Sequence, residues 1–412
     1  MTGEGESAPP APNSSPARLI AIMCLAEVLG MLSNATFPAL IPEFRQLWGL
    51  SNTEAGWIGG VYYGGYVAAV PLLVSLTDRR DPRAIYLLST ALGGLAALGF
   101  ALLAGGVWSA VVFRMLGGVG LAGTYMVGLK LLTDLVPDRS QGRAVAFYTA
   151  SFGLGMSVST LAAGEVAALA GWRWAFGSAA LGSLAALLLV WLLVPRPQAE
   201  TPPPDGHALD FRPVLANRRA LAYVLGYAAH VWELFGTRNW IVAFIVFGFG
   251  LHPAERLPAM SATQIAAVVL LLGLPASILG NEIAGRWGRR RTAGVIMLIC
   301  ALLSCLLGFL AGLPPWLLIL VLVVHHTLLM GDSSALTAGA VARAQPGRRG
   351  ATMAVHALLG FGAGFLAPLA FGVVLDLAGG AESIVAWGLA FVLMGLGPIL
   401  LGLPVLARMG RR

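Results

Sequence analysis

The chain has 412 residues, of which 58% are hydrophobic and only 11% are charged, whereas soluble domains carry about 25% charged residues. This composition excludes a soluble globular protein and predicts an all-α integral membrane protein. The net charge of +7 reflects the loops of a membrane protein, so we expect no nucleic-acid partner. The three cysteines lack the spacing of a disulfide framework or a zinc module, and we expect no metal and no cofactor.

The predicted elements follow from apolar runs separated by polar or Gly/Pro segments. Residues 1–17 are small, acidic and rich in Pro and Ser, and are expected to form a disordered cytoplasmic tail. Twelve transmembrane helices follow, at 18–41, 54–77, 84–104, 107–133, 142–169, 173–195, 220–250, 263–285, 292–312, 315–341, 350–377 and 383–406. The polar connection 196–219 separates an N-terminal six-helix bundle, 18–195, from a C-terminal one, 220–406, and a basic cytoplasmic tail at 407–412 ends the chain.

The positions of the basic residues predict the orientation in the membrane. With the N-terminus inside, twenty of the 26 Lys and Arg residues lie in cytoplasmic segments, three lie in the opposite loops and three lie within helices. Positive charge is enriched in cytoplasmic loops, so both termini are expected in the cytoplasm. We therefore expect a monomeric, multi-pass protein of a bacterial-type cytoplasmic (inner) membrane.

The two halves show weak internal similarity. A shift of 208 residues places Gly142 on Gly350 at the start of a helix, and Gly164 on Gly372 near its other end. Parallel six-helix repeats are typical of a large class of secondary transporters. The chain has no G-x-x-x-x-G-K-[ST] motif, so an ion gradient rather than ATP is the expected source of energy.

Four short motifs occur at corresponding places in this topology. They are Asp78, Arg79 and Arg83 between the second and third helices, Gly285-Arg-Trp-Gly-Arg-Arg290 between the eighth and ninth, Arg114-Met-Leu-Gly-Gly-Val-Gly120 in the fourth, and GWRWAF from Gly171 after the fifth. In these motifs and in its six-plus-six organisation the chain resembles the major facilitator superfamily. The resemblance implies the twelve-helix fold of that family, alternating access, and a central cavity lined by helices 1, 4, 7 and 10.

Polar and ionisable side chains at membrane depth are costly and commonly mark transport pathways or proton relays. Most of those in this chain fall on the four helices that the resemblance places around the cavity. The candidate substrate-binding and proton-binding residues are Glu27 and Asn34 in helix 1, Arg114 in helix 4, Tyr223, Tyr227, His230, Glu233 and Arg238 in helix 7, and His325, His326 and Asp332 in helix 10.

The chemistry of these residues gives two interpretations. Burial favours the neutral form of a carboxylic acid and histidine titrates near neutrality, so Glu27, Glu233, Asp332 and the histidines are candidates for proton exchange. Arg114 and Arg238 keep their charge, and either could hold an anionic substrate. In the alternative interpretation the same groups pair with one another and with backbone carbonyls, and serve only to join helices.

A second set of charged residues lies near the cytoplasmic ends of the helices. We expect these residues to hold the inner gate closed in one state of the transport cycle. The gating candidates are Asp78, Arg79, Arg83, Arg143, Glu282 and Arg286.

The sequence therefore predicts a secondary active transporter, not an enzyme, that moves a small polar or anionic solute through the lipid bilayer, coupled to protons. A polyspecific efflux pump of the same fold is the first alternative, although Thr160 stands where the family's antiporters carry a proline. A metal-ion transporter using the intramembrane histidines is the second, but adjacent His325 and His326 point about 100° apart on a helix, and no Cys or Met cluster accompanies them.

Overall fold

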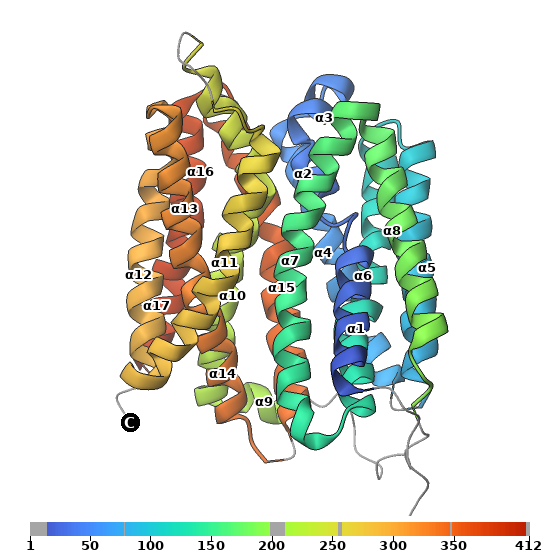
Figure 1. The fold of residues 1–412 in the computed structure, drawn as a ribbon. Helices are drawn as coiled ribbons and strands as arrows, with labels where there is room; N and C mark the ends of the chain where they lie inside the picture. Colours follow the sequence, from blue (N-terminus) through green and yellow to red (C-terminus); the bar gives the residue numbers. More distant parts are fainter. Residues whose placement is uncertain (1–14, 78, 198–210, 254–257, 347, 409–412) are drawn as a thin grey trace, which may run out of the picture.

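The computed structural model describes residues 15–77, 79–197, 211–253, 258–346 and 348–408. The described residues are almost entirely helical, and most of the helices run side by side along one direction (Figure 1). The α-helices are α1 (Pro16–Gly30), α2 (Thr36–Ala39), α3 (Ile41–Trp48), α4 (Asn52–Leu76), α5 (Pro82–Leu103), α6 (Val107–Leu135), α7 (Asp138–Ala170), α8 (Trp172–Leu193), α9 (Arg212–Ala216), α10 (Arg218–Gly250), α11 (Ala262–Trp287), α12 (Arg289–Leu307), α13 (Pro315–Gly331), α14 (Ser333–Arg343), α15 (Arg349–Leu377), α16 (Ile384–Gly397) and α17 (Leu403–Arg408).

Among the described residues, ten segments are long and apolar enough to cross a membrane, and they coincide with ten of the predicted helices. The predicted first and seventh helices are not among the ten. The first is divided into α1, α2 and α3, and the seventh, α10, is continuous over 33 residues but carries many polar side chains. The all-helical membrane class predicted from the sequence is therefore confirmed.

The prediction of one uninterrupted helix is wrong at three places. The segment 18–41 opens into turns between Met31 and Ala35. The helix expected at 315–341 breaks at Asp332, which ends α13 and precedes α14. The helix expected at 383–406 contains a π-helical turn, Pro398–Gly402. Helix breaks at membrane depth occur where neighbouring side chains satisfy the freed backbone groups, which hydropathy does not report.

Local signals repeat between the two halves of the chain. Both α4 and α11 begin with a reciprocal capping box, formed by Ser51 with Glu54 and by Ser261 with Gln264. Gly171 ends α7 with φ of 87°, and Gly379, 208 residues later, follows α15 with φ of 112°. Only glycine adopts these angles without strain. The shift of 208 residues found in the sequence therefore also relates the two turns at the ends of α7 and α15.

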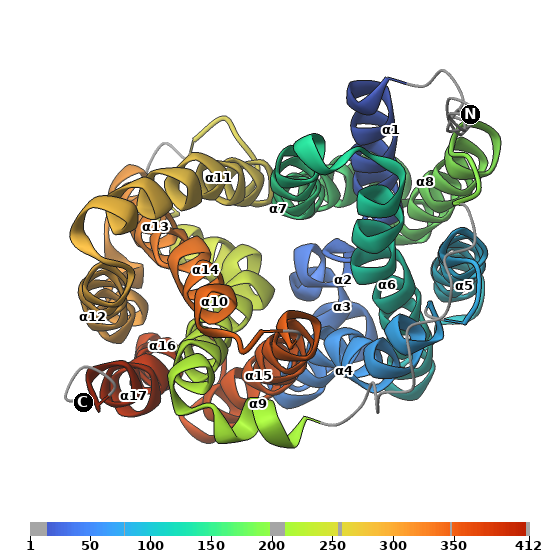
Figure 2. The same cartoon turned by 90° about the horizontal axis from the view of Figure 1, so that it is seen from below.

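The helices form two groups, which Figure 2 shows side by side from below. Helices α1 and α4–α8 pack on one another, and α10–α17 pack on one another. The two largest contacts between the halves of the chain are two seams, one between α4 and α15 and the other between α7 and α11, and α2 and α3 also contact α10.

The α4–α15 seam is lined by glycines. A Cβ atom on Gly56 or Gly60 would overlap the carbonyl oxygen of Pro368 or Phe365, respectively, and one on Gly372 would overlap that of Asn52. Small residues at four-residue spacing let membrane helices approach backbone to backbone. The glycines therefore set how closely the two groups of helices meet.

Hydrogen bonds join the groups at the end of the molecule where α3 lies, at the top of Figure 1. The Asp376 carboxylate accepts bonds from the backbone N–H groups of Asn52 (3.0 Å) and Thr53 (2.7 Å) and from both side chains. Across the other seam, Gln264 donates to Glu165 at 2.8 Å. Each of these two carboxylates therefore binds the opposite group of helices.

Candidate functional site

Arg114 of α6 binds the backbone of the segment between α1 and α2, where the first predicted helix is interrupted. Its guanidinium donates to the carbonyl oxygens of Ser33 (2.7 Å) and Asn34 (2.9 Å), approaches that of Ile58 at 3.5 Å, and lies 4.3 Å from the centre of the Tyr62 ring. The side chain is 2% exposed. Protein groups therefore already occupy most of its donors.

Glu27 of α1 is buried beside Tyr148 of α7. The Tyr148 hydroxyl lies 2.8 Å from Glu27 Oε2 and 2.8 Å from the Thr124 carbonyl oxygen, and donates to one of them at a time. Glu27 Oε1 has no hydrogen-bond partner within the described ranges. The carboxyl group is thus held at one oxygen and unpaired at the other.

The polar residues of α10 divide into three groups. The first group joins His230 to Asp332 at the α13–α14 break, with 2.8 Å between His230 Nδ1 and Asp332 Oδ1. The two atoms are at ion-pair distance but poorly aligned for a hydrogen bond. Nearby, the ring of Tyr227 stacks on that of His356 at 3.8 Å.

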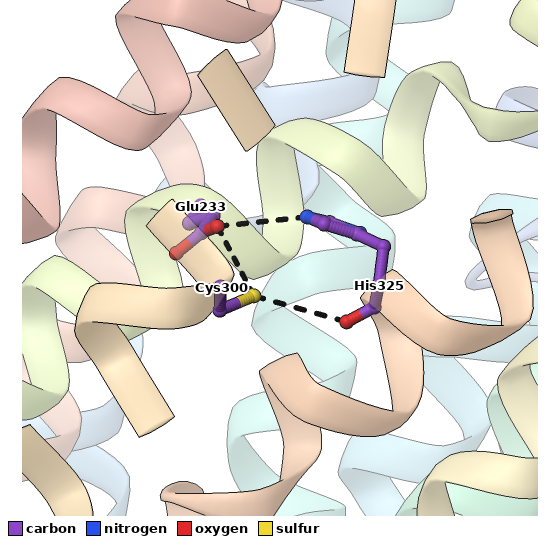
Figure 3. A group of neighbouring side chains, drawn as sticks. All are labelled: Glu233, Cys300 and His325. Carbon is purple, nitrogen blue, oxygen red and sulfur yellow. Dashed lines mark hydrogen bonds and ion pairs between the residues drawn. The ribbon is translucent and has the colours of Figure 1, made fainter. Parts of the chain in front are cut away.

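The second group is centred on Glu233 and is drawn in Figure 3. Glu233 Oε1 accepts a bond from the Ser304 hydroxyl (2.5 Å) and one from the Cys300 thiol (3.3 Å), and lies 3.5 Å from His325 Nε2. Ser304 Oγ also lies 2.6 Å from His325 Nε2. All four side chains are buried, so three helices, α10, α12 and α13, enclose one polar cluster.

The third group contains Arg238, which is in a different situation from Arg114. Its guanidinium contacts the Met330 sulfur at 3.4 Å and faces the Phe235 ring at 5.8 Å, and its Nε atom has no hydrogen-bond partner in the described chain. Neither recorded contact neutralises the charge. His326, 1% exposed, likewise has no partner at either ring nitrogen among the described residues.

The remaining substrate candidates lie apart from these groups. The Asn34 side chain accepts a bond from the Tyr63 hydroxyl at 2.9 Å, next to aromatic contacts of Tyr63 with Phe235 and Phe361. Tyr223 packs in an apolar cluster against α14. Asn34 therefore faces the interface between the two groups of helices, whereas Tyr223 is part of a core.

The five gating candidates that lie among the described residues are not joined by ion pairs. Arg83 is buried and donates to the Trp191 carbonyl oxygen within its own group of helices. The side chains of Arg79, Arg143, Glu282 and Arg286 are exposed, and no ion pair links them within the residues that the structure describes. Asp78 lies outside the described residues. In this conformation the hydrogen bonds between the two groups lie toward the α3 end.

Sequence reasoning missed several members of the site. Cys300 and Ser304 lie in the apolar run predicted as the helix 292–312, and neither was named as a candidate. The argument against metal was that no Cys or Met cluster accompanies the histidines, but the structure places one cysteine, Cys300, beside His325 and Glu233. Cys300 and Ser304 are four residues apart and therefore share a helix face. This four-residue spacing of two polar side chains, on the helix face that packs against Glu233 and His325, was the signal in the sequence that could have identified them.

The fold defines the chain as an all-helical, multi-pass integral membrane protein that buries several ionisable groups between its helices. The sequence-family model of the Major Facilitator Superfamily matches residues 23–358, so the chain belongs to this family.

Two relatives and one solved structure illustrate the similarity. Human protein spinster homolog 1 is 24% identical over 303 residues, which cover 69% of this chain and 57% of that protein. The probable sulfoacetate transporter SauU of Cupriavidus necator is 22% identical over 290 residues, covering 66% and 65% of the two chains. The crystal structure of a bacterial homolog to the human lysosomal transporter Spinster, inward-facing and occupied, has a TM-score of 0.79 at 17% identity and covers 97% of this chain and 98% of its own.

Proposed function

We propose that the chain is a proton-coupled secondary transporter of a small organic anion, working by alternating access between two six-helix bundles, 18–195 and 220–406. In this proposal twelve segments cross a bacterial-type cytoplasmic membrane, both termini lie in the cytoplasm, and the protein is a monomer. The 20-to-3 distribution of basic residues supports the orientation. The α3 end is then the outer end, and the hydrogen bonds found there hold the outer gate closed.

Arg238 is the observation that carries the substrate class. The Arg238 guanidinium is buried, and its recorded partners are a thioether and an aromatic ring. Its desolvation is therefore unfavourable and is not offset by an ionic partner. A carboxylate or sulfonate would satisfy its fork of N–H donors. The relative named for sulfoacetate, an organic anion, is consistent with this substrate class.

The surroundings of Arg238 favour an anion with an apolar part. Phe235, Met330 and Tyr63 lie around it, and His326 offers two unpaired ring nitrogens at the same depth. One fixed positive charge among apolar and neutral polar groups suits a monoanion better than a phosphate dianion. We therefore place the anionic group of the substrate at Arg238.

The proton site in this proposal is the His230–Asp332 pair. The pair can gain or lose one proton. It lies at the α13–α14 break, so a change in its charge acts directly on the geometry of the two helices. Glu233 with His325 is a second pair on the same helices, and Glu27 is the corresponding carboxyl in the first bundle.

Uptake into proteoliposomes tests the function. With an imposed pH gradient, we expect accumulation of organic monoanions such as nicotinate or benzoate analogues, accompanied by proton movement. Arg238→Gln should lower the apparent affinity by about 10- to 100-fold, because hydrogen bonds to a charged group contribute about 1.5–3 kcal/mol. Arg173→Gln, at an exposed arginine next to Trp172, is the control. Export of lipophilic cations without anion uptake would instead favour the efflux pump.

Asp332→Asn separates coupling from transport. The variant removes the carboxyl group of the pair and the negative charge that stabilises a protonated His230. Uptake should therefore no longer respond to the pH gradient, while exchange of labelled for unlabelled substrate continues. Glu382→Gln, an exposed carboxyl at the α3 end, should leave both measurements unchanged. Gradient-driven uptake that persists in Asp332→Asn would remove the pair from the coupling mechanism.

A further inference from the structure

The cluster of Glu233, Cys300 and His325 has the composition of a metal site. It offers a carboxylate oxygen, a thiol sulfur and an imidazole nitrogen from three different helices, all within 4.8 Å of one another. Figure 3 shows the three side chains pointing toward a common space. These are the ligand types of zinc, whereas Mg²⁺ and Ca²⁺ require shells of oxygen.

Two of the three distances between ligand atoms agree with tetrahedral coordination, and the third, between Cys300 Sγ and His325 Nε2, is within 4.8 Å. Ligand atoms bound to Zn²⁺ at about 2.1 Å for nitrogen and oxygen and 2.3 Å for sulfur are separated by roughly 3.4 to 3.6 Å. Here Glu233 Oε1 lies 3.5 Å from His325 Nε2 and 3.3 Å from Cys300 Sγ. An ion could bind to these atoms after only small side-chain movements.

Charge balance also favours a divalent ion. A carboxylate and a thiolate together carry two negative charges, and a neutral imidazole adds none, so a bound Zn²⁺ makes the cluster neutral. Neutrality matters because all three side chains are at most 1% exposed within the bundle, where an uncompensated charge is strongly unfavourable. On binding, the Cys300 thiol loses its proton to solvent as the metal–sulfur bond forms.

The Ser304 hydroxyl occupies the space that the ion would enter. It lies 2.5 Å from Glu233 Oε1 and 2.6 Å from His325 Nε2, close to both ligand atoms at once. Metal binding therefore displaces this hydroxyl by a rotamer change, and removal of the hydroxyl does not remove a ligand.

We propose that Glu233, Cys300 and His325 form a binding site for a Zn²⁺-like divalent ion that links α10, α12 and α13. The site is distinct from a transport path for metal ions, since it uses only His325 of the two adjacent histidines and joins helices of a single group. It shares Glu233 with the second acid–histidine pair, so protons and the ion compete for it.

Cobalt binding to the full-length protein in detergent tests the site without any transport assay. One equivalent of Co²⁺ should produce the thiolate-to-cobalt charge-transfer band and the intense visible absorption of tetrahedral cobalt, both displaced by Zn²⁺ and lost on acidification. A chain with Cys24→Ala and Cys305→Ala, in which Cys300 is the one remaining thiol, should keep both signals.

Variants of the cluster complete the test. Cys300→Ala should abolish the charge-transfer band and weaken binding by more than about 100-fold, beyond the usual effect of losing an outer-shell partner. Ser304→Ala should retain the band, and its unfolding midpoint in the absence of metal shows that it folds. Absence of the band in the unmodified protein, its persistence in Cys300→Ala, or its loss in folded Ser304→Ala would overturn the proposal.

Discussion

Replacing Gly60 with valine is expected to hold the protein open at the α3 end and to abolish transport. A Cβ atom at this position would overlap the backbone carbonyl oxygen of Phe365 on the opposite helix. Backbone atoms cannot rotate away as a side chain can, so α4 and α15 must separate to accommodate valine. Closure of this end, which alternating access requires, is then lost, whereas the state open at the α3 end is unaffected.

The change is measurable as a distance. Spin labels at Leu47 on α3, next to the start of α4, and at Leu377 at the end of α15, both exposed, should move apart in Gly60→Val, in a chain whose own cysteines are replaced by serine. Substrate exchange should fall at least about 100-fold, because valine leaves no close-packed arrangement of the seam. Gly294→Val provides the control, since a Cβ there meets no atom within 4 Å. Unchanged label distances in Gly60→Val would show that the seam does not open during the cycle.

The same seam shows what the sequence could and could not predict. Apolar runs predicted most of the helices, because hydropathy is a property of each segment by itself. Short motifs within single segments gave the resemblance to the family. Hydropathy does not show which glycines face the other group of helices, because that depends on how two segments pack together. The spacing of Gly56 and Gly60 is visible in the sequence, but their partners Pro368 and Phe365 lie about three hundred residues away.

The intramembrane polar residues show the same division. Sequence reasoning located Glu233 and His325 as ionisable groups at membrane depth, and the structure brings them to 3.5 Å. Sequence reasoning did not identify Cys300 and Ser304, because a single cysteine or serine in an apolar helix is common and does not by itself indicate a site. The unwinding at Met31–Ala35 also escaped, since its cause is the guanidinium of Arg114 in another helix.

Arg114 and Arg238, which the sequence could not distinguish, are expected to respond to the same substitution in opposite ways. Arg114→Gln removes two well-formed charged hydrogen bonds and leaves the Ser33 and Asn34 carbonyl oxygens without donors inside the bundle. With about 1.5–3 kcal/mol for each such bond, the loss is about 3–6 kcal/mol, a large part of the stability of a folded protein. We expect a markedly lower unfolding temperature and poor recovery from the membrane.

Arg238→Gln should leave the unfolding temperature unchanged or slightly higher, because it removes a buried charge whose recorded contacts are a sulfur atom and an aromatic ring. What it should lose is the rise in unfolding temperature that a bound organic monoanion produces in the unmodified protein, since a ligand stabilises only the state that binds it. Thermal unfolding of both variants with and without the anion therefore separates the two arginines by one measurement. If Arg114→Gln kept its stability and lost the response to the anion, the assignment of substrate binding to Arg238 would be reversed. The physical basis of the contrast is that a guanidinium already bonded to backbone carbonyls has few donors left to offer a ligand, whereas an unpaired one gains most of its stabilisation from that ligand.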